Sequence, residues 1–203
     1  MKKRTMALLA AVLLIVGGII GGTLAWLTAK TTPVVNTFTT SDININLTEE
    51  TGEIKNGEHH YKMIPGWDIT KDPKVTVIGG SEDCYLFVRL EKSANYDTYL
   101  EPYVVVTTGD KAWTKLEGDG VPETVYYQKV AANAANQEFD ILEGNKVTVK
   151  EDVTKTMMQN VRDNNNYPKL TVTAYASQLY KKNGTGSDAE FTPLEAWNNV
   201  PKN

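Results

Sequence analysis

Cysteine is almost absent from this chain of 203 residues, because Cys84 is the only one. A single cysteine excludes an intramolecular disulfide, so the fold has to be stabilised by non-covalent packing. The residues that follow, 85–90, are apolar and strand-like. This context favours a buried small side chain at Cys84 over a reactive thiol.

Histidine is also scarce, with His59 and His60 as the only two. Adjacent side chains point to opposite faces of a strand, so this pair does not easily converge on one metal ion. The His-Glu-x-x-His pattern of zinc peptidases is absent, and no serine occupies a Gly-x-Ser-x-Gly elbow. We therefore predict no catalytic residue, no cofactor and no metal ligand, with both histidine rings solvated in a polar loop or hairpin at 51–60.

Positive charge is in deficit, since 21 Lys and Arg residues face 25 Asp and Glu residues and give a formal charge of −4. Removal of residues 1–25 would take away three basic residues and no acidic one, which lowers this charge to −7. A nucleic-acid-binding domain needs a basic surface, so the composition excludes nucleic acid as a partner. Weak calcium binding by acidic residues at 140–152 stays open as an alternative.

Charge is missing altogether between Met6 and Leu27, and the basic residues 2–4 precede this apolar run. A basic start followed by a long apolar run is typical of an export signal. The run of 22 residues is also long enough to span a bilayer as a helix, so a retained membrane anchor is the alternative.

The end of the apolar run favours cleavage over retention. The glycines of 17–22 weaken the last helical turns, and Thr23 and Ala25 place small side chains at positions −3 and −1 of a cleavage site. We predict a cut after Ala25, so that the mature chain begins at Trp26. One domain is the simplest organisation for the residues that remain.

Residues 26–40 predict an extended arm or an edge strand. They are rich in Thr and Val, which favour extended backbone, whereas Pro33 cannot donate to a β-ladder. Val34, Val35 and Phe38 are the apolar anchors of this arm.

Residues 41–203 predict about eight short strands separated by turn signals, and two short helices at 153–162 and 192–200. The strand at 84–91 carries apolar residues on both faces near its start, which places it at the centre of a sheet. The closing helix has a capping box at Thr192 and Glu195, and its apolar face is expected to plug one end of the core. The predicted fold is all-β: an antiparallel β-sandwich or jelly roll with one or two short peripheral helices, preceded by an N-terminal signal helix.

Several segments carry a family resemblance. Two lie near the start of the chain: GGTLAWLT at 21–28, and NTF at 36–38 leading into ININLTE at 43–49. The others are MIPG at 63–66, KDP at 71–73, SEDCYLFV at 81–88 and EAW at 195–197. Together they resemble the TasA/camelysin group, Gram-positive exported proteins that are processed by a signal peptidase of the SipW type.

The resemblance implies a secreted jelly-roll protein of the extracellular, biofilm matrix that forms fibres. In this group the N-terminal segment of one subunit is added as a strand to the sheet of the next, a role that residues 26–38 could take here. The implied partners are the signal peptidase and further copies of the chain, with membrane contact only through an uncleaved signal segment. The alternatives are a surface-tethered adhesion or ligand-binding module and a camelysin-type surface metalloprotease, for which this chain has no recognisable metal-binding motif.

Overall fold

The computed structural model describes residues 42–55, 57–182 and 188–201, and it divides the chain between Thr40 and Ser41. Among these described residues, no helix is both long enough and apolar enough to cross a membrane. The predictions for the signal segment and the arm lie outside them, and these concern Thr23, Ala25, Trp26, Val34, Val35 and Phe38. The description below therefore concerns the part that begins after the arm.

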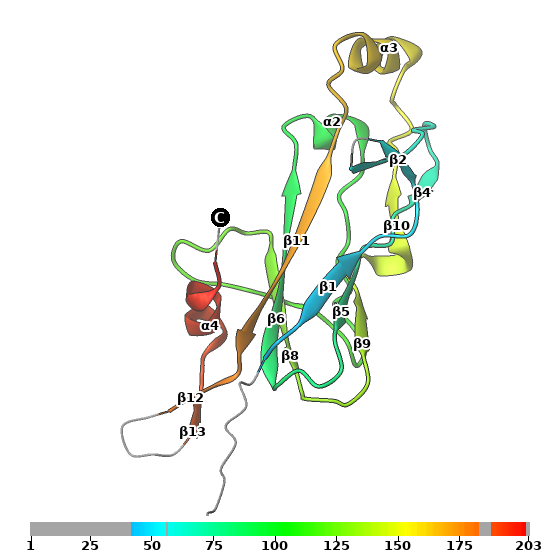
Figure 1. Cartoon of the computed structure of the whole chain (residues 1–203). Helices are drawn as coiled ribbons and strands as arrows, with labels where there is room; N and C mark the ends of the chain where they lie inside the picture. The colour runs from blue at the N-terminus through cyan, green and yellow to red at the C-terminus, as the bar shows by residue number, and fades with distance from the viewer. Residues whose placement is uncertain (1–41, 56, 183–187, 202–203) are drawn as a thin grey trace, which may run out of the picture. The chain divides into compact units, whose positions relative to one another are not determined.

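A four-stranded antiparallel sheet forms one layer of the fold (Figure 1). Its strands follow the order β11 (Leu170–Gln178), β6 (Cys84–Lys92), β8 (Val125–Val130) and β7 (Thr114–Lys115). β6 pairs with β11 along nine residues on one side and with β8 on the other. The central position predicted for this strand is therefore confirmed.

A three-stranded antiparallel sheet packs against one face of β6. It follows the order β1 (Ile45–Thr48), β5 (Lys74–Val77) and β9 (Gln137–Asp140). Alternate residues of β6, from Cys84 to Leu90, form one hydrophobic cluster with buried residues of β5 and β9. This burial of apolar surface between two sheets provides the main stabilisation of the fold.

The opposite face of β6 is covered by α4 (Pro193–Asn199). Tyr85 and Phe87 project to this side, where the ring of Phe87 lies 5.4 Å from that of Trp197 between centroids. The predicted capping box is confirmed, because the side chains of Thr192 and Glu195 each accept a hydrogen bond from the other's backbone N–H. The helix covers a sheet face, however, and does not plug one end of the core between the sheets.

Shorter elements complete the described part. Three two-stranded ladders join β2 (Glu53–Lys55) to β3 (Glu58–His60), β4 (Asp68–Thr70) to β10 (Lys146–Thr148), and β12 (Tyr180–Lys182) to β13 (Asp188–Glu190). The predicted helix at 153–162 is present as α3 (Lys155–Asp163), whereas α2 (Tyr96–Tyr99) and a 3-10 turn, η1 (Glu143–Asn145), were not expected. The all-β class is confirmed, and the jelly-roll arrangement stays a prediction.

Two strands predicted in the middle of the chain are largely missing. Residues 103–107 contribute a single β-bridge, from Val105 to Leu142, and the strand expected at 111–116 is reduced to the two residues of β7. Trp113 turns into the core in this region and is 2% exposed. The segment around it follows the edge of β9, so its backbone does not extend a ladder.

Candidate functional site: the strand edges and a buried polar network

The two histidines lie in the β2–β3 hairpin. They are neighbours in β3, where His60 is exposed and His59 is half-buried. His59 Nδ1 lies 2.7 Å from the carbonyl oxygen of Thr51, so this nitrogen carries the proton and donates. The prediction that both rings are solvated is wrong for His59, because the β2–β3 hairpin brings it back to residue 51. Among the described residues, no group of three His, Cys, Asp or Glu side chains could hold a metal ion.

Cys84 is buried at the start of β6, as its apolar context predicted. Burial, with a smaller contribution from the charge of Asp83, raises the pKa of its thiol to about 11. A thiol with such a pKa stays protonated at neutral pH and is a poor nucleophile. Its position therefore agrees with a packing role.

The edge of the three-stranded sheet at β9 is covered by side chains. Lys111 Nζ donates a 2.8 Å hydrogen bond to the backbone oxygen of Glu138. Trp113 Nε1 donates another of 2.8 Å to the backbone oxygen of Asp140. These two donors occupy backbone acceptors that an added strand would otherwise use.

The edge of the four-stranded sheet at β7 is short. β7 has only two residues, Thr114 and Lys115, and both are exposed. A very short edge strand that carries a lysine is a common means of preventing edge-to-edge pairing. β7 and β9 are thus both protected, although by different means.

The opposite edge of this sheet, at β11, lacks these protections. β11 is nine residues long and contains no charged residue, no proline and no glycine. Among the described residues it pairs only with β6, so its other side has no ladder partner there. Val172, Ala174 and Ala176 pack against the core but stay half-buried. A long, uncharged edge of this kind is able to accept another strand.

β1 lies close to β11 without pairing with it. It comes within 8 Å of β11 between Cα atoms, yet it forms its ladder with β5. β1 has only four residues, compared with nine in β11. It therefore lies beside β11 without satisfying the unpaired backbone groups of that strand.

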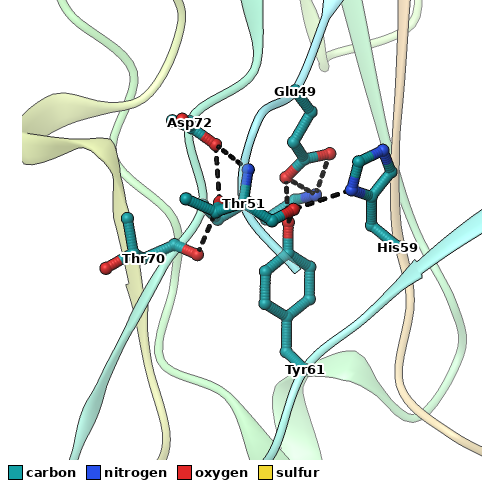
Figure 2. A network of polar contacts seen from close by, with 7 residues as sticks. Glu49, Thr51, His59, Tyr61, Thr70 and Asp72 are labelled. Carbon is teal, nitrogen blue, oxygen red and sulfur yellow. Dashed lines mark hydrogen bonds and ion pairs between the residues drawn. The ribbon is translucent and has the colours of Figure 1, made fainter. Parts of the chain in front are cut away.

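A partly buried polar network follows directly after β1 (Figure 2). Lys71, only 8% exposed, places its Nζ 2.9 Å and 3.1 Å from the two carboxylate oxygens of Glu49. The Tyr61 hydroxyl also donates to Glu49, and the Tyr61 ring centroid lies 5.4 Å from Lys71 Nζ. Gly52 permits this packing, since a Cβ at that position would lie 2.8 Å from the Tyr61 ring.

The second half of the network joins Thr51 to Asp72. The backbone N–H of Thr51 donates to Asp72 Oδ1 at 3.1 Å, and the Thr51 hydroxyl lies 2.5 Å from the same oxygen. That hydroxyl is also 3.1 Å from the carbonyl oxygen of Thr70. In Figure 2 these groups and the Glu49 carboxylate surround the backbone of Thr51. The network thus ties the residues after β1 to the link between β4 and β5.

The titration of two groups reflects these contacts. Burial, reinforced by the hydrogen bond to Glu49, raises the pKa of Tyr61 well above its ordinary value of 10.0. Burial alone would raise the pKa of Asp72, but hydrogen bonds from Thr51 and neighbouring backbone N–H groups outweigh it and lower this pKa. Tyr61 is therefore a stable donor and Asp72 a stable acceptor at neutral pH.

Sequence reasoning predicted neither this network nor the hydrogen bonds from Lys111 and Trp113 to the edge of β9. Lys71 and Glu49 are separated by 22 positions, and Trp113 and Asp140 by 27. Residues 71–73 carry part of the family resemblance, but no local periodicity in the sequence marks a partner at such a distance.

Comparisons with known proteins place no constraint on the function. No protein-family model, no curated protein and no solved structure matches this chain. The resemblance to the TasA/camelysin group stays an expectation from short motifs. A function therefore has to follow from the chemistry of the described surface.

Proposed function

We propose that the chain is an exported structural protein that assembles into fibres of an extracellular matrix. Residues 26–40 of one copy add as a strand to the open edge of β11 in the next copy. The observation that supports this proposal most is that β11 is long and uncharged and, among the described residues, unpaired on one side, whereas β7 is short and β9 is capped. An enzymatic function has no comparable support in the described residues.

Strand addition fits the chemistry of both partners. An added strand supplies main-chain hydrogen bonds to an edge, and side-chain contacts then set its register. Residues 31–40 are uncharged, as β11 is, and the half-buried Ala174 and Ala176 are small. Val34, Val35 and Phe38 of the arm supply the apolar side chains that would cover this part of the core.

The geometry of such a contact leads to a filament. The arm and the acceptor edge are different surfaces, so the interface is heterologous and does not close between two copies. Each added copy presents a new open edge. Export supplies the arm, because a signal peptidase of the SipW type would cut after Ala25 and release the chain from the membrane.

The first test compares the chain from Trp26 to Asn203 with a truncated chain that begins at Ser41. Electron microscopy should show fibres of the longer chain and none of the truncated one. Equal fibre formation by the two chains would rule out a donor role for the arm.

The second test concerns the acceptor edge. Thr171→Lys adds a charge to β11 opposite Glu91 of β6, where the new lysine has a favourable neighbour. We expect this variant to fold and to lose fibre formation. Thr114→Lys on the short edge β7 is the matched control and should assemble normally; equal behaviour of the two variants would exclude β11 as the acceptor.

A surface-tethered binding module is the second candidate, and one exposed turn favours it. Ile64 and Trp67 are the ends of a turn closed by a 3.0 Å backbone hydrogen bond, and their exposed fractions are 43% and 64%. Two exposed apolar side chains on one turn are suited to contact with a partner. Mass spectrometry of the N-terminus distinguishes the candidates, since an intact Met1 in the membrane fraction favours the tether.

A further inference from the structure

We infer that the polar network after β1 is a latch that holds β1 in place and so limits access to the open edge of β11. The latch consists of Glu49, Thr51, Tyr61, Lys71 and Asp72. The first claim, that the network holds β1 in place, concerns β1 alone. The second claim, that this limits access of another strand to β11, rests on the proposed function.

Apart from the latch, β1 is attached through its ladder to β5 and through hydrogen bonds at its start, where Asn44 N–H donates to Ser81 Oγ and Glu82 N–H donates to the backbone oxygen of Asp42. It pairs with β5 over four residues, and one of its apolar side chains, Leu47, is 37% exposed. Before β1, the backbone oxygen of Asn44 accepts from Ile78 N–H at 2.9 Å. A four-residue strand at the edge of a sheet frays readily unless its ends are fixed.

The latch fixes the end of β1 through two anchors, Lys71 and Asp72. Lys71 and Asp72 lie between β4 and β5, and the Lys71 N–H donates to the backbone oxygen of Asn145 at 2.8 Å. Glu49 and Thr51 are thus held by residues that lie between two strands fixed by other ladders, β4 with β10 and β5 with β9. Loss of the Glu49 charge would leave Lys71 buried and without its counter-ion, which weakens this anchor.

Movement of β1 would change the environment of β11. The half-buried residues Ile43 and Ile45 pack in the same cluster as Val172, Ala174 and Ala176. β1 also approaches β11 within 8 Å between Cα atoms. Release of β1 therefore uncovers apolar side chains beside the open edge and makes room for an incoming strand.

Hydrogen exchange of the full chain, read by mass spectrometry, tests the latch. Glu49→Gln should accelerate exchange in residues 43–48 by roughly tenfold, because this variant favours local opening of β1. Exchange in β6 should stay unchanged. Glu50→Gln is the matched control, since it removes the same charge from the adjacent, exposed position and should have no effect.

Unchanged exchange in residues 43–48 of Glu49→Gln would overturn the latch. Equal acceleration across β6 and β1 would overturn it too, because the network would then stabilise the whole domain. Thr51→Val removes the hydroxyl contacts to Asp72 and Thr70, leaves the Glu49–Lys71 pair in place, and provides the same test if Glu49→Gln does not fold.

Fibre formation separates the latch from the proposed function. If the latch limits access, Glu49→Gln should assemble at a lower protein concentration than the unaltered chain. Faster exchange in β1 with unchanged assembly would refute control of access. Faster exchange together with no assembly of any chain would leave the mechanical latch standing and refute the proposed function.

Discussion

The edges at β9 and β11 differ in whether side chains form hydrogen bonds with their backbone groups. At β9, Lys111 and Trp113 reach across from a neighbouring segment and donate to two backbone oxygens. At β11, nine uncharged residues have no such cover in the described part of the chain. Both edges belong to one fold with the same general need to avoid unwanted pairing.

The difference indicates that, in the described part of the chain, the edges at β9 and β11 are not protected alike. If every sheet edge were long and lacked covering side chains, the exposure of β11 would only reflect a general property of small antiparallel sheets. Because β7 is short and β9 is capped, the exposure of β11 instead agrees with a surface kept available for a strand. Three variants test this comparison.

The largest expected effect comes from Trp113→Ala. It removes a side chain that is 2% exposed and also caps Asp140, so we expect a loss of about 3–5 kcal/mol in the free energy of unfolding. Denaturant unfolding measures this change. Trp67→Ala removes the same side-chain type from a site 64% exposed and should change stability by less than about 0.5 kcal/mol. Equal losses would show that Trp113 does not anchor the β9 side of the core.

A smaller effect concerns pH and the latch beside β11. The pKa of Asp72 is lowered in the folded chain, so its contribution is present above the ordinary value of 3.8 and is lost as pH falls through the lower folded pKa. We expect this contribution to be below about 1 kcal/mol, because solvent screens a partly exposed carboxylate.

Asp72→Asn should therefore be less stable than the unaltered chain at pH 6, and this difference should shrink as the pH falls below 3.8. Urea unfolding at several pH values measures it. A difference that grows on acidification would contradict the assigned direction of the pKa.

The smallest effect on stability is expected from Lys111→Met. The side chain is exposed, so the free energy of unfolding should change by less than about 0.5 kcal/mol. The backbone oxygen of Glu138 loses its donor, however, and β9 should then show weak self-association in sedimentation experiments. Lys155→Met on α3 removes the same charge away from any edge. If the two variants associate equally, Lys111 does not prevent pairing at the edge of β9.

The elements that sequence reasoning predicted well are those whose signals are local. In β6, apolar residues on both faces indicated a central strand, and it lies between β11 and β8. The capping box at Thr192 and Glu195 marked the start of α4 within four residues of sequence. Such signals work because the interacting groups are close along the chain.

The predictions that were wrong concern residues whose partners are not immediate neighbours along the chain. Residues 103–107 have the composition of a strand, yet only Val105 forms a bridge, with Leu142. His59 was expected to be solvated, but a hairpin brings its ring to the carbonyl oxygen of Thr51. Leu142 lies 37 positions from Val105 and Thr51 lies eight positions from His59, so in both cases a contact beyond the range of local periodicity overrode the local pattern.

The sequence by itself determined the all-β class, the central strand β6 and the capped helix α4, because periodicity and capping depend on near neighbours along the chain. Only the tertiary structure decided which strand edges are covered and which stays open. It also decided that Glu49, Tyr61 and Lys71 meet after β1. The physical reason is that caps and ion pairs depend on distances in space, and here the partners are separated by 12 to 27 positions in the chain.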